Sequence, residues 1–400
     1  MRIARHDSRA QSLLPPADGQ WATDGLRKRG RLEGRLKLAL LGTRGIPANY
    51  GGFETCVEEL STRLAALGHD VTVYCRTPQI DFPGDVYRGV TLVKLPTLRN
   101  KYTDTLAHST LAALHAIVRR YDAVFVFGVG NSPACALLRA GRLPVLLNVD
   151  GLDWQREKWP ALAKWCLRLA ERMAVRVAHR TITDSPNVQR YYREQRGRQL
   201  DYIPYGADPE QISPNGTLTR FALRPNEYFL YVGRLEPENH VHDLVDAARN
   251  AQATMPTVVV GDAPYASDYI ADLRSRAGDA VRFTGAIYGD GYWELNQHAY
   301  TYVFPVMSSG THPALIEAMA CGNCVLVRDT PDNRNVGGDA VRYFSSIVEL
   351  SALMRWATAT PAEVARLGAC AAERARDLYD WDRVTAEYLA LARKVLAARG

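Results

Sequence analysis

The sequence predicts an α/β protein made of two doubly wound domains in series. Short apolar strand-like runs alternate with amphipathic helical stretches, and this alternation occurs twice. A chain of 400 residues with 47% hydrophobic content is too long for one compact core. We therefore expect a loosely attached extension at 1–35, a first domain at 36–205, a second at 206–378 and a C-terminal helix at 379–400.

The first domain opens with a strand–helix–strand unit. Lys37–Leu41 is an apolar strand-like run, and apolar residues then recur at helical spacing from Phe53 to Leu67. Gly68 ends this helix, and Val71–Tyr74 is the next strand. Further strands are expected at Thr91–Lys94, Ala123–Phe127, Val145–Val149 and Thr181–Thr183, with helices at Thr103–Arg119 and from Trp159 to Ala178. Residues 1–35 show no sustained periodicity, which predicts disorder.

The loop after the first strand, LLGTRGIPANYGGFET, is rich in glycine. It has no Walker lysine and does not match G-x-G-x-x-G. It is expected at the carboxyl end of a parallel strand, where glycines such as Gly51 and Gly52 let backbone N–H groups approach an anion at a helix N-terminus. The alternative is that the glycines only make a tight turn.

The second alternation begins near Tyr228, beyond a join around Pro204 to Pro214. Its strands are expected at Tyr228–Val232, Thr257–Val260, Ala280–Thr284, Thr301–Pro305 and Cys324–Val327. Its helices are expected at Val241–Ala248, Ser267–Ala277, Tyr292–Gln297 and Pro313–Ala320. The stretch from Trp381 to Ala398 predicts a further amphipathic helix, which would brace both domains.

The segment SSGTHPALIEAMACGNCVLV predicts a second anion-binding helix terminus. Thr311 or His312 can cap a helix that has Pro313 in its first turn, so the N–H groups from Gly310 onward would face a phosphate. Glu317 lies one turn further on the same face, where its carboxylate could accept hydrogen bonds from ribose hydroxyls. A surface glutamate without a ligand is the alternative.

Composition restricts the class of protein. Seven scattered cysteines predict no disulfide framework, and Cys321 and Cys324 are interpreted as small core residues, so a reducing cytoplasm is expected. No secretory signal or membrane-spanning run is predicted. Residues 155–180 carry seven Lys/Arg against two Asp/Glu, with Arg168, Arg172, Arg176 and Arg180 four apart. This face is either simply solvated or docks on the inner, anionic face of the cell membrane; no motif supports nucleic-acid binding.

Four segments together resemble a known family. LGTRGIPANYGGFET, NVDGLDWQREKW, VGRLEPEN and GTHPALIEAMACGN, in that order and spacing, are similar to the retaining glycosyltransferases of family 4 with the GT-B fold. More narrowly, they resemble the rhamnosyltransferase-like branch of bacterial surface-polysaccharide synthesis. The resemblance covers about residues 36–395. It implies that a nucleotide sugar binds mainly to the second domain and an acceptor mainly to the first.

The resemblance also implies roles for single residues. Arg234 of VGRL matches the arginine that contacts the donor diphosphate, Glu317 the ribose-binding glutamate, and Gly51 and Gly52 the glycine pair facing the phosphates. Two positions depart from many relatives, because Ser309 replaces a second glutamate and Asn239 replaces a lysine. Asp150 in NVDGLDW, or its neighbour Asp153, could orient an acceptor hydroxyl, although a loop-capping role is the equal alternative.

The expected activity is therefore metal-independent transfer of a hexose or deoxyhexose, with rhamnose favoured. The donor would be a dTDP-, UDP- or GDP-sugar and the acceptor an oligosaccharide or a lipid-diphosphate-linked sugar. Arg234 would stabilise the leaving diphosphate, without a metal or other cofactor. Three alternatives stay open: a sugar-nucleotide epimerase of the same fold, a nicotinamide oxidoreductase, and a catalytically silent partner subunit.

Overall fold

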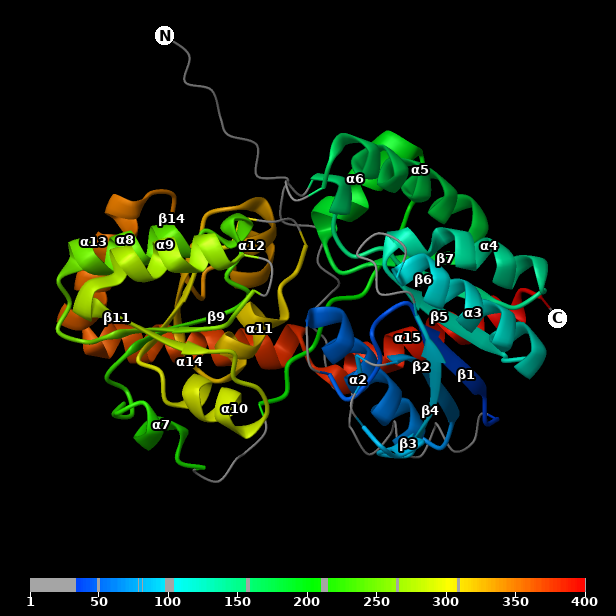
Figure 1. The fold of residues 1–400 in the computed structure, drawn as a ribbon, viewed down its shortest axis with the longest axis horizontal. Helices are drawn as coiled ribbons and strands as arrows, with labels where there is room; N and C mark the ends of the chain where they lie inside the picture. Colours follow the sequence, from blue (N-terminus) through cyan, green and yellow to red (C-terminus); the bar gives the residue numbers. More distant parts are fainter. Residues whose placement is uncertain are drawn as a thin grey trace, which may run out of the picture. The chain divides into compact units, whose positions relative to one another are not determined.

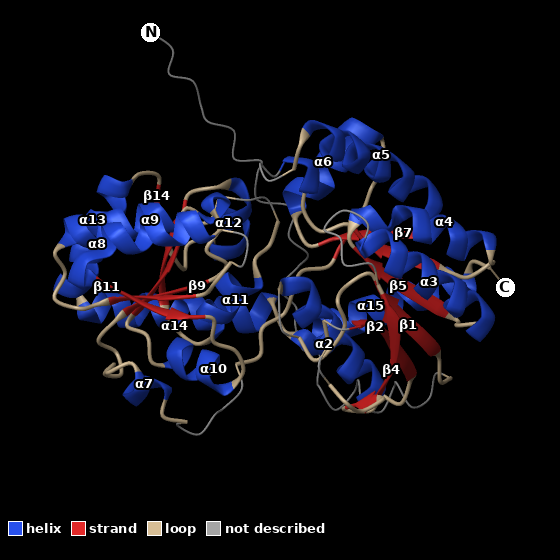
Figure 2. Ribbon diagram, viewed as in Figure 1, coloured by secondary structure: helices blue, strands red, loops and turns tan. Residues whose placement is uncertain are grey.

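Two mainly parallel β-sheets organise the compact unit Leu36–Gly400 of the computed structural model. The structure describes residues 34–48, 51–77, 79–80, 82–97, 104–155, 159–209, 215–263, 266–307 and 310–399. Figure 1 shows helices around each sheet, and Figure 2 shows the strands of each sheet side by side. The predicted fold of two doubly wound units is confirmed. The expected extension lies almost entirely outside the described residues.

The first sheet has eight strands in the order β3-β4-β2-β1-β5-β6-β7-β8. All its pairs are parallel except the short β3–β4 pair. Its strands are β1 (Lys37–Leu41), β2 (Asp70–Thr77), β3 (Val86–Tyr87), β4 (Val90–Pro96), β5 (Ala123–Phe127), β6 (Val145–Asn148), β7 (Arg180–Thr183) and β8 (Asp201–Tyr202). Its helices are α2 (Gly52–Ala66), α3 (Asp104–Arg119), α4 (Ser132–Ala140), α5 (Ala161–Val177) and α6 (Pro186–Arg196), with 3-10 turns η1 (Val129–Asn131) and η2 (Asp153–Gln155).

The second sheet has six parallel strands in the order β11-β10-β9-β12-β13-β14. Numbered within the sheet this is 3-2-1-4-5-6, the order of dinucleotide-binding folds. Its strands are β9 (Phe229–Val232), β10 (Thr257–Val260), β11 (Val281–Gly285), β12 (Thr301–Phe304), β13 (Cys324–Arg328) and β14 (Arg342–Phe344). Its helices are α7 (Thr217–Arg220), α8 (Val241–Ala251), α9 (Ser267–Ala277), α10 (Asp290–Gln297), α11 (Pro313–Ala320), α12 (Pro331–Gly337) and α13 (Ile347–Ala359), with η3 (Pro237–Asn239) and η4 (Gly278–Ala280).

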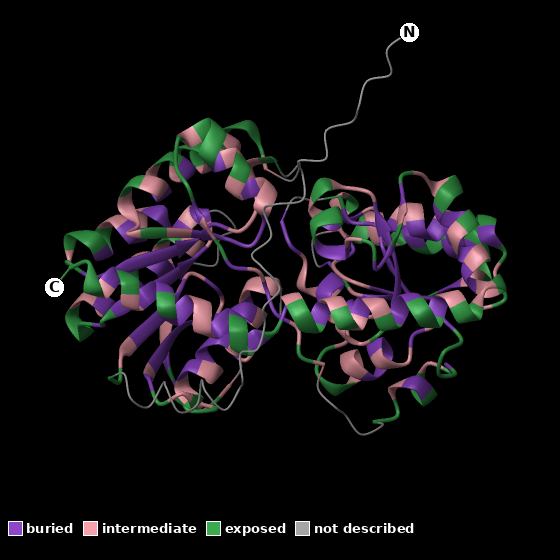
Figure 3. Cartoon of the chain, turned by 180° about the vertical axis from the view of Figure 1, so that it is seen from behind, coloured by how far each residue is buried: buried purple, intermediate pink, exposed green. Residues whose placement is uncertain are grey.

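The C-terminal helices connect with both sheets. Helix α14 (Pro361–Leu378) packs on α11 and β13, whereas α15 (Trp381–Ala397) packs on α2. The Tyr388 ring of α15 meets Phe125 edge to face and stacks on Phe127, and its hydroxyl accepts a hydrogen bond from Asn148 Nδ2 at 2.7 Å. The buried residues concentrate on the strands and on the helix faces that cover them (Figure 3). Among the described helices, none is long and apolar enough to cross a bilayer.

Candidate active site

Both sheets have a point where the strand order reverses, and the predicted loops lie there. In the second sheet β9 and β12 are neighbours, with Phe229 opposite Thr301, although β10 and β11 lie between them in sequence. Arg234 follows β9 and α11 follows β12, so both lie at the carboxyl edge of this switch point. In the first sheet the switch point lies between β1 and β5, where the glycine-rich loop begins. Ligands of open α/β sheets bind at such positions.

Two glycines of the first loop are required by packing. Gly42 has φ +110°, and a Cβ there would lie 2.4 Å from the backbone oxygen of Phe127. Gly45 has φ +115°, and its Cβ would lie 2.5 Å from Cys75 Sγ. Both values are far below a van der Waals contact, so neither position accepts a side chain. For these two glycines the tight-turn alternative is sufficient.

Gly52 is close to a residue of the second domain, Pro313, which begins α11. A Cβ on Gly52 would lie 2.9 Å from Pro313 Cγ, whereas a Cβ on Gly51 would meet only Glu54 Oε2, at 3.5 Å. Gly51 has an extended backbone that any residue adopts. The glycine loop therefore meets the first residue of α11 through Gly52. A role of either glycine in donor binding stays a prediction.

The N-terminus of α11 is held by the first domain in a way the sequence did not reveal. The Thr311 N–H donates to Asp184 Oδ2 at 2.8 Å, and its hydroxyl donates to the Asp184 backbone oxygen at 2.6 Å. The predicted availability of the Thr311 N–H to a phosphate is therefore wrong for this conformation. His312 is the N-cap residue, but its side chain makes no capping hydrogen bond and packs at 5.2 Å from the Phe304 ring.

Asp184 is fully buried, and burial raises the pKa of its carboxyl well above the usual value; the nearby Asp150 charge raises it further. Its Oδ1 makes no hydrogen bond with any residue that the structure describes. The next residue, Ser185, hydrogen-bonds to Asp332 of α12, which also accepts from Asn187 Nδ2 at 3.1 Å. Asp184 directly follows the predicted strand Thr181–Thr183, just as Asp150 follows the strand before it. This shared position after a strand could have identified Asp184 as a candidate site residue from the sequence.

Asp150 lies beside the loop that precedes α11. Its Oδ1 accepts a hydrogen bond from the Tyr205 hydroxyl at 3.3 Å, and a Cβ on Gly310 would lie 3.9 Å from the same oxygen. Its backbone adopts φ +60° and donates to Asn148 Oδ1 at 2.9 Å. Asp153, the other candidate, begins the η2 turn. Asp150 thus approaches the second domain at Gly310.

Arg234 is placed by a short loop after β9. Its backbone oxygen accepts from Asn239 Nδ2 at 2.7 Å, so the asparagine shapes this loop. Its guanidinium Nη1 lies 3.1 Å from Glu236 Oε2, and both side chains are partly exposed. Such a pair contributes little stability in water, so an incoming diphosphate could compete with Glu236 for the guanidinium.

Glu317 is half-buried on α11 and is hydrogen-bonded by the Tyr292 hydroxyl of α10. Burial raises the pKa of Glu317 to about 7; the hydrogen bond from Tyr292 lowers it, and the Glu59 charge raises it. The pKa of the Tyr292 phenol is raised well above its usual value by burial and by Glu317. Tyr292 therefore donates to a carboxyl that titrates near neutrality. The sequence identified the glutamate but not this tyrosine.

One cluster of the described residues has the donor types of a metal site. His240, His242 and Asp243 bring their ligand atoms within 4.8 Å of one another at the start of α8. However, Arg328 is ion-paired with Asp243, and the Tyr269 hydroxyl lies 2.9 Å from His242 Nδ1. A cation would have to displace that guanidinium, so the donor set fits a metal poorly.

The chain matches two family models. Residues 51–206 match the glycosyl transferase 4-like domain, and residues 226–349 match glycosyl transferases group 1. The glycogen synthase of Mycobacterium tuberculosis (strain ATCC 25618 / H37Rv) is 26% identical over 402 residues, covering 88% of this chain and 92% of that protein.

Solved structures share the fold over nearly the whole chain. A sucrose-phosphate synthase from Thermosynechococcus elongatus superposes with a TM-score of 0.79 at 22% identity, covering 91% of this chain and 100% of that one. The Anabaena protein HepE, solved in complex with UDP-glucose, has a TM-score of 0.72 at 18% identity and covers 89% of this chain and 100% of its own.

Proposed function

Since the chain is a glycosyltransferase of the GT-B type, we propose that it moves a hexose or deoxyhexose from a nucleotide sugar to a glycan or lipid-linked sugar. We further propose that it retains the anomeric configuration and serves cell-surface polysaccharide synthesis. The observation that best supports transfer from a donor to an acceptor is a pair of close approaches between the two domains. Gly52 lies against Pro313, and Gly310 lies near Asp150. These approaches bring the candidate acceptor side and the candidate donor side together.

The proposed donor site lies at the switch point of the second sheet. Arg234 would contact the diphosphate, the first turn of α11 would offer its unpaired amides, and Glu317 would accept hydrogen bonds from the ribose. Because the Thr311 amide is bonded to Asp184, the phosphate contacts would come from neighbouring amides such as that of Ala314, in the first turn. A dTDP-, UDP- or GDP-sugar would satisfy these groups.

The reaction would break the bond between the anomeric carbon and the diphosphate oxygen, whose electrons leave with the diphosphate. The acceptor hydroxyl oxygen would form the new bond on the same face of the sugar, and its proton would pass to the departing phosphate. The largest demand on the protein is then to stabilise negative charge on the leaving group, which Arg234 and the oriented amides can do. Asp150 would orient the acceptor hydroxyl.

Rhamnose is the favoured sugar because the four motifs resemble the rhamnosyltransferase-like branch. The test is a panel of dTDP-, UDP- and GDP-sugars, including dTDP-rhamnose and UDP-glucose, offered with lipid-diphosphate sugars. Product linkage and anomeric configuration are read by NMR, and an inverted product would refute the proposal of retention. Donor incubated without acceptor is the control, because interconversion of the donor alone would instead identify an epimerase.

Helix α5 is the proposed contact with an anionic membrane. Leu162, Trp165 and Leu169 are 72%, 61% and 50% exposed and share one face with Arg172 and Arg176. The two arginines line a cavity of about 160 Å³ with Arg196 and Arg198. The predicted four-arginine face is corrected in part, because Arg180 lies in β7 and pairs with Asp201, and Arg168 stacks on Trp154 at 4.2 Å.

Vesicle flotation tests this contact. Arg172→Glu with Arg176→Glu should weaken binding to anionic vesicles, because each basic residue near such a surface contributes about 1 kcal/mol. Arg355→Glu with Arg366→Glu on α13 and α14 is the charge-matched control. Equal flotation of the two double variants would contradict the proposal.

A further inference from the structure

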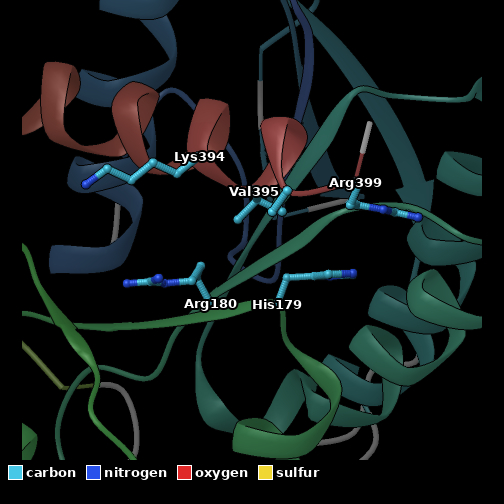
Figure 4. A pocket seen from close by; sticks show the side chains of 6 residues that line it. His179, Arg180, Lys394, Val395 and Arg399 are labelled. Carbon is cyan, nitrogen blue, oxygen red and sulfur yellow. The ribbon is translucent and has the colours of Figure 1, made fainter.

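A second cavity, of about 310 Å³, lies where the end of α15 passes the start of β7 (Figure 4). It is lined by His179, Arg180, Lys394, Val395, Ala398 and Arg399. Among the described residues, the lining thus holds three basic side chains and one histidine, and no acidic residue. A cavity of this size is at the lower end of small-ligand sites.

The cavity is separate from the proposed donor and acceptor site. His179 and Arg180 stand at the amino end of β7, whereas Asp184, which contacts α11, follows its carboxyl end. Four residues of strand separate the two edges of the sheet by roughly 13 Å at about 3.3 Å per residue. A ligand here would not touch the reacting groups.

The side chains offer hydrogen-bond donors toward an anion. The Val145 N–H donates to His179 Nδ1 at 3.0 Å, so the ring hydrogen is assigned to Nε2, which is a donor even when the imidazole is neutral. The Lys394 side chain is exposed and makes no hydrogen bond or ion pair with any residue that the structure describes. Arg399 uses Nη2 for the Arg142 backbone oxygen at 2.8 Å and keeps further N–H groups.

A purely structural reason explains only part of this charge. Basic residues in the last turn of a helix complement its dipole, which accounts for Lys394 and Arg399. It does not account for His179 and Arg180, which lie at the start of β7. Arg180 is the side chain with a nearby counter-charge, since its Nε donates to Asp201 at 2.7 Å. In Figure 4, Arg180 and Lys394 extend to one side, and His179 and Arg399 to the other.

We propose that this cavity binds a phosphate- or diphosphate-bearing anion. Its charged groups would bridge the start of β7 and the end of α15. Lys394 and Arg399 are exposed and extend to opposite sides in Figure 4, and each would turn toward the anion to contact it. The site is independent of the proposed transfer reaction. The anion could be a free phosphate compound or a lipid headgroup, and the two are distinguished by experiment.

Calorimetric titration of the full chain with inorganic pyrophosphate at low salt is the first arm. Lys394→Gln with Arg399→Gln should weaken binding about tenfold or more, because charge-assisted hydrogen bonds to phosphate are lost. Arg383→Gln, at the other end of α15, is the matched control and should bind as its parent does. These titrations are made in the Arg234→Ala background, so that pyrophosphate bound at the proposed donor site does not contribute.

Flotation with vesicles containing an anionic phospholipid is the second arm. Loss of pyrophosphate binding in the double variant supports a site for free phosphate compounds. Loss of flotation in the double variant, with no pyrophosphate binding by the Arg234→Ala parent, supports a lipid headgroup. If the double variant, folded by circular dichroism, matches Arg383→Gln in both arms, or if no pyrophosphate binding and no flotation are seen without Arg234, the proposal is overturned.

Discussion

Donor binding should strengthen as the pH rises through neutrality if Glu317 holds the ribose. Burial places the pKa of this carboxyl at about 7, and the carboxylate is the better acceptor for two ribose hydroxyls. About a tenth of the groups are ionised at pH 6 and about nine tenths at pH 8. Donor affinity should therefore rise about tenfold between these two values.

The assay is calorimetric titration with the nucleotide sugar that the donor panel selects, because its diphosphate diester does not ionise in this range. Glu317→Gln should bind more weakly at pH 8 and lose the dependence on pH. Its fold should survive, since the side chain is half-buried on the first turns of α11.

Tyr292→Phe supplies the internal control. The Tyr292 hydrogen bond lowers the pKa of Glu317, so its removal should move the midpoint of the affinity curve to higher pH. Donor affinity of the wild type that stays constant from pH 6 to pH 8, or a Glu317→Gln variant that keeps the wild-type slope, would refute the assignment of Glu317 to the ribose.

Two further predictions concern the contact between the domains and a buried histidine. Gly52→Ala should reduce turnover without unfolding the chain, because its Cβ would lie 2.9 Å from Pro313 Cγ, whereas Gly51→Ala should be tolerated; equal turnover of the two variants counts against the contact. Burial lowers the pKa of His108 to about 4, with the Arg76 charge adding to the effect. The folded state therefore disfavours protonation, and stability should fall as the pH drops from 6.5 toward 4. Urea unfolding should show that the His108→Phe variant loses less free energy of unfolding than the wild type over this range, by up to about 3 kcal/mol. The same dependence of the free energy of unfolding on pH in both proteins would contradict this.

Most of the fold could be predicted from the sequence because hydrophobic periodicity is a local signal. The strand Thr257–Val260 and the helices Ser267–Ala277 and Pro313–Ala320 have the predicted bounds. The short strands β3, β8 and β14 were not predicted, because two or three residues show no periodicity. Six of the described helices were also missed: α4, α6, α7, α12, α13 and α14.

The candidate site could be predicted only where local motifs define it. The positions of Arg234 and Glu317 at the second switch point follow from strand–loop–helix order, which the sequence displays. The contact of Thr311 with Asp184 joins residues 127 positions apart, so no local pattern could reveal it. The pairing of Arg234 with Glu236 lies within one loop, but its geometry depends on how Asn239 folds that loop.

The turnover of Arg234 variants, measured with and without EDTA, tests the central claim most directly. If Arg234 stabilises the leaving diphosphate, Arg234→Ala should lower turnover about a hundredfold, which corresponds to about 3 kcal/mol for one preorganised contact. Arg234→Lys should restore only part of this rate, because a lysine cannot bridge two phosphate oxygens, and Arg366→Ala on α14 should retain full activity. Wild-type turnover should persist in EDTA. A fully active Arg234→Ala enzyme, or loss of wild-type activity in EDTA with rescue by Mg²⁺ or Mn²⁺, would contradict this account of the leaving-group site.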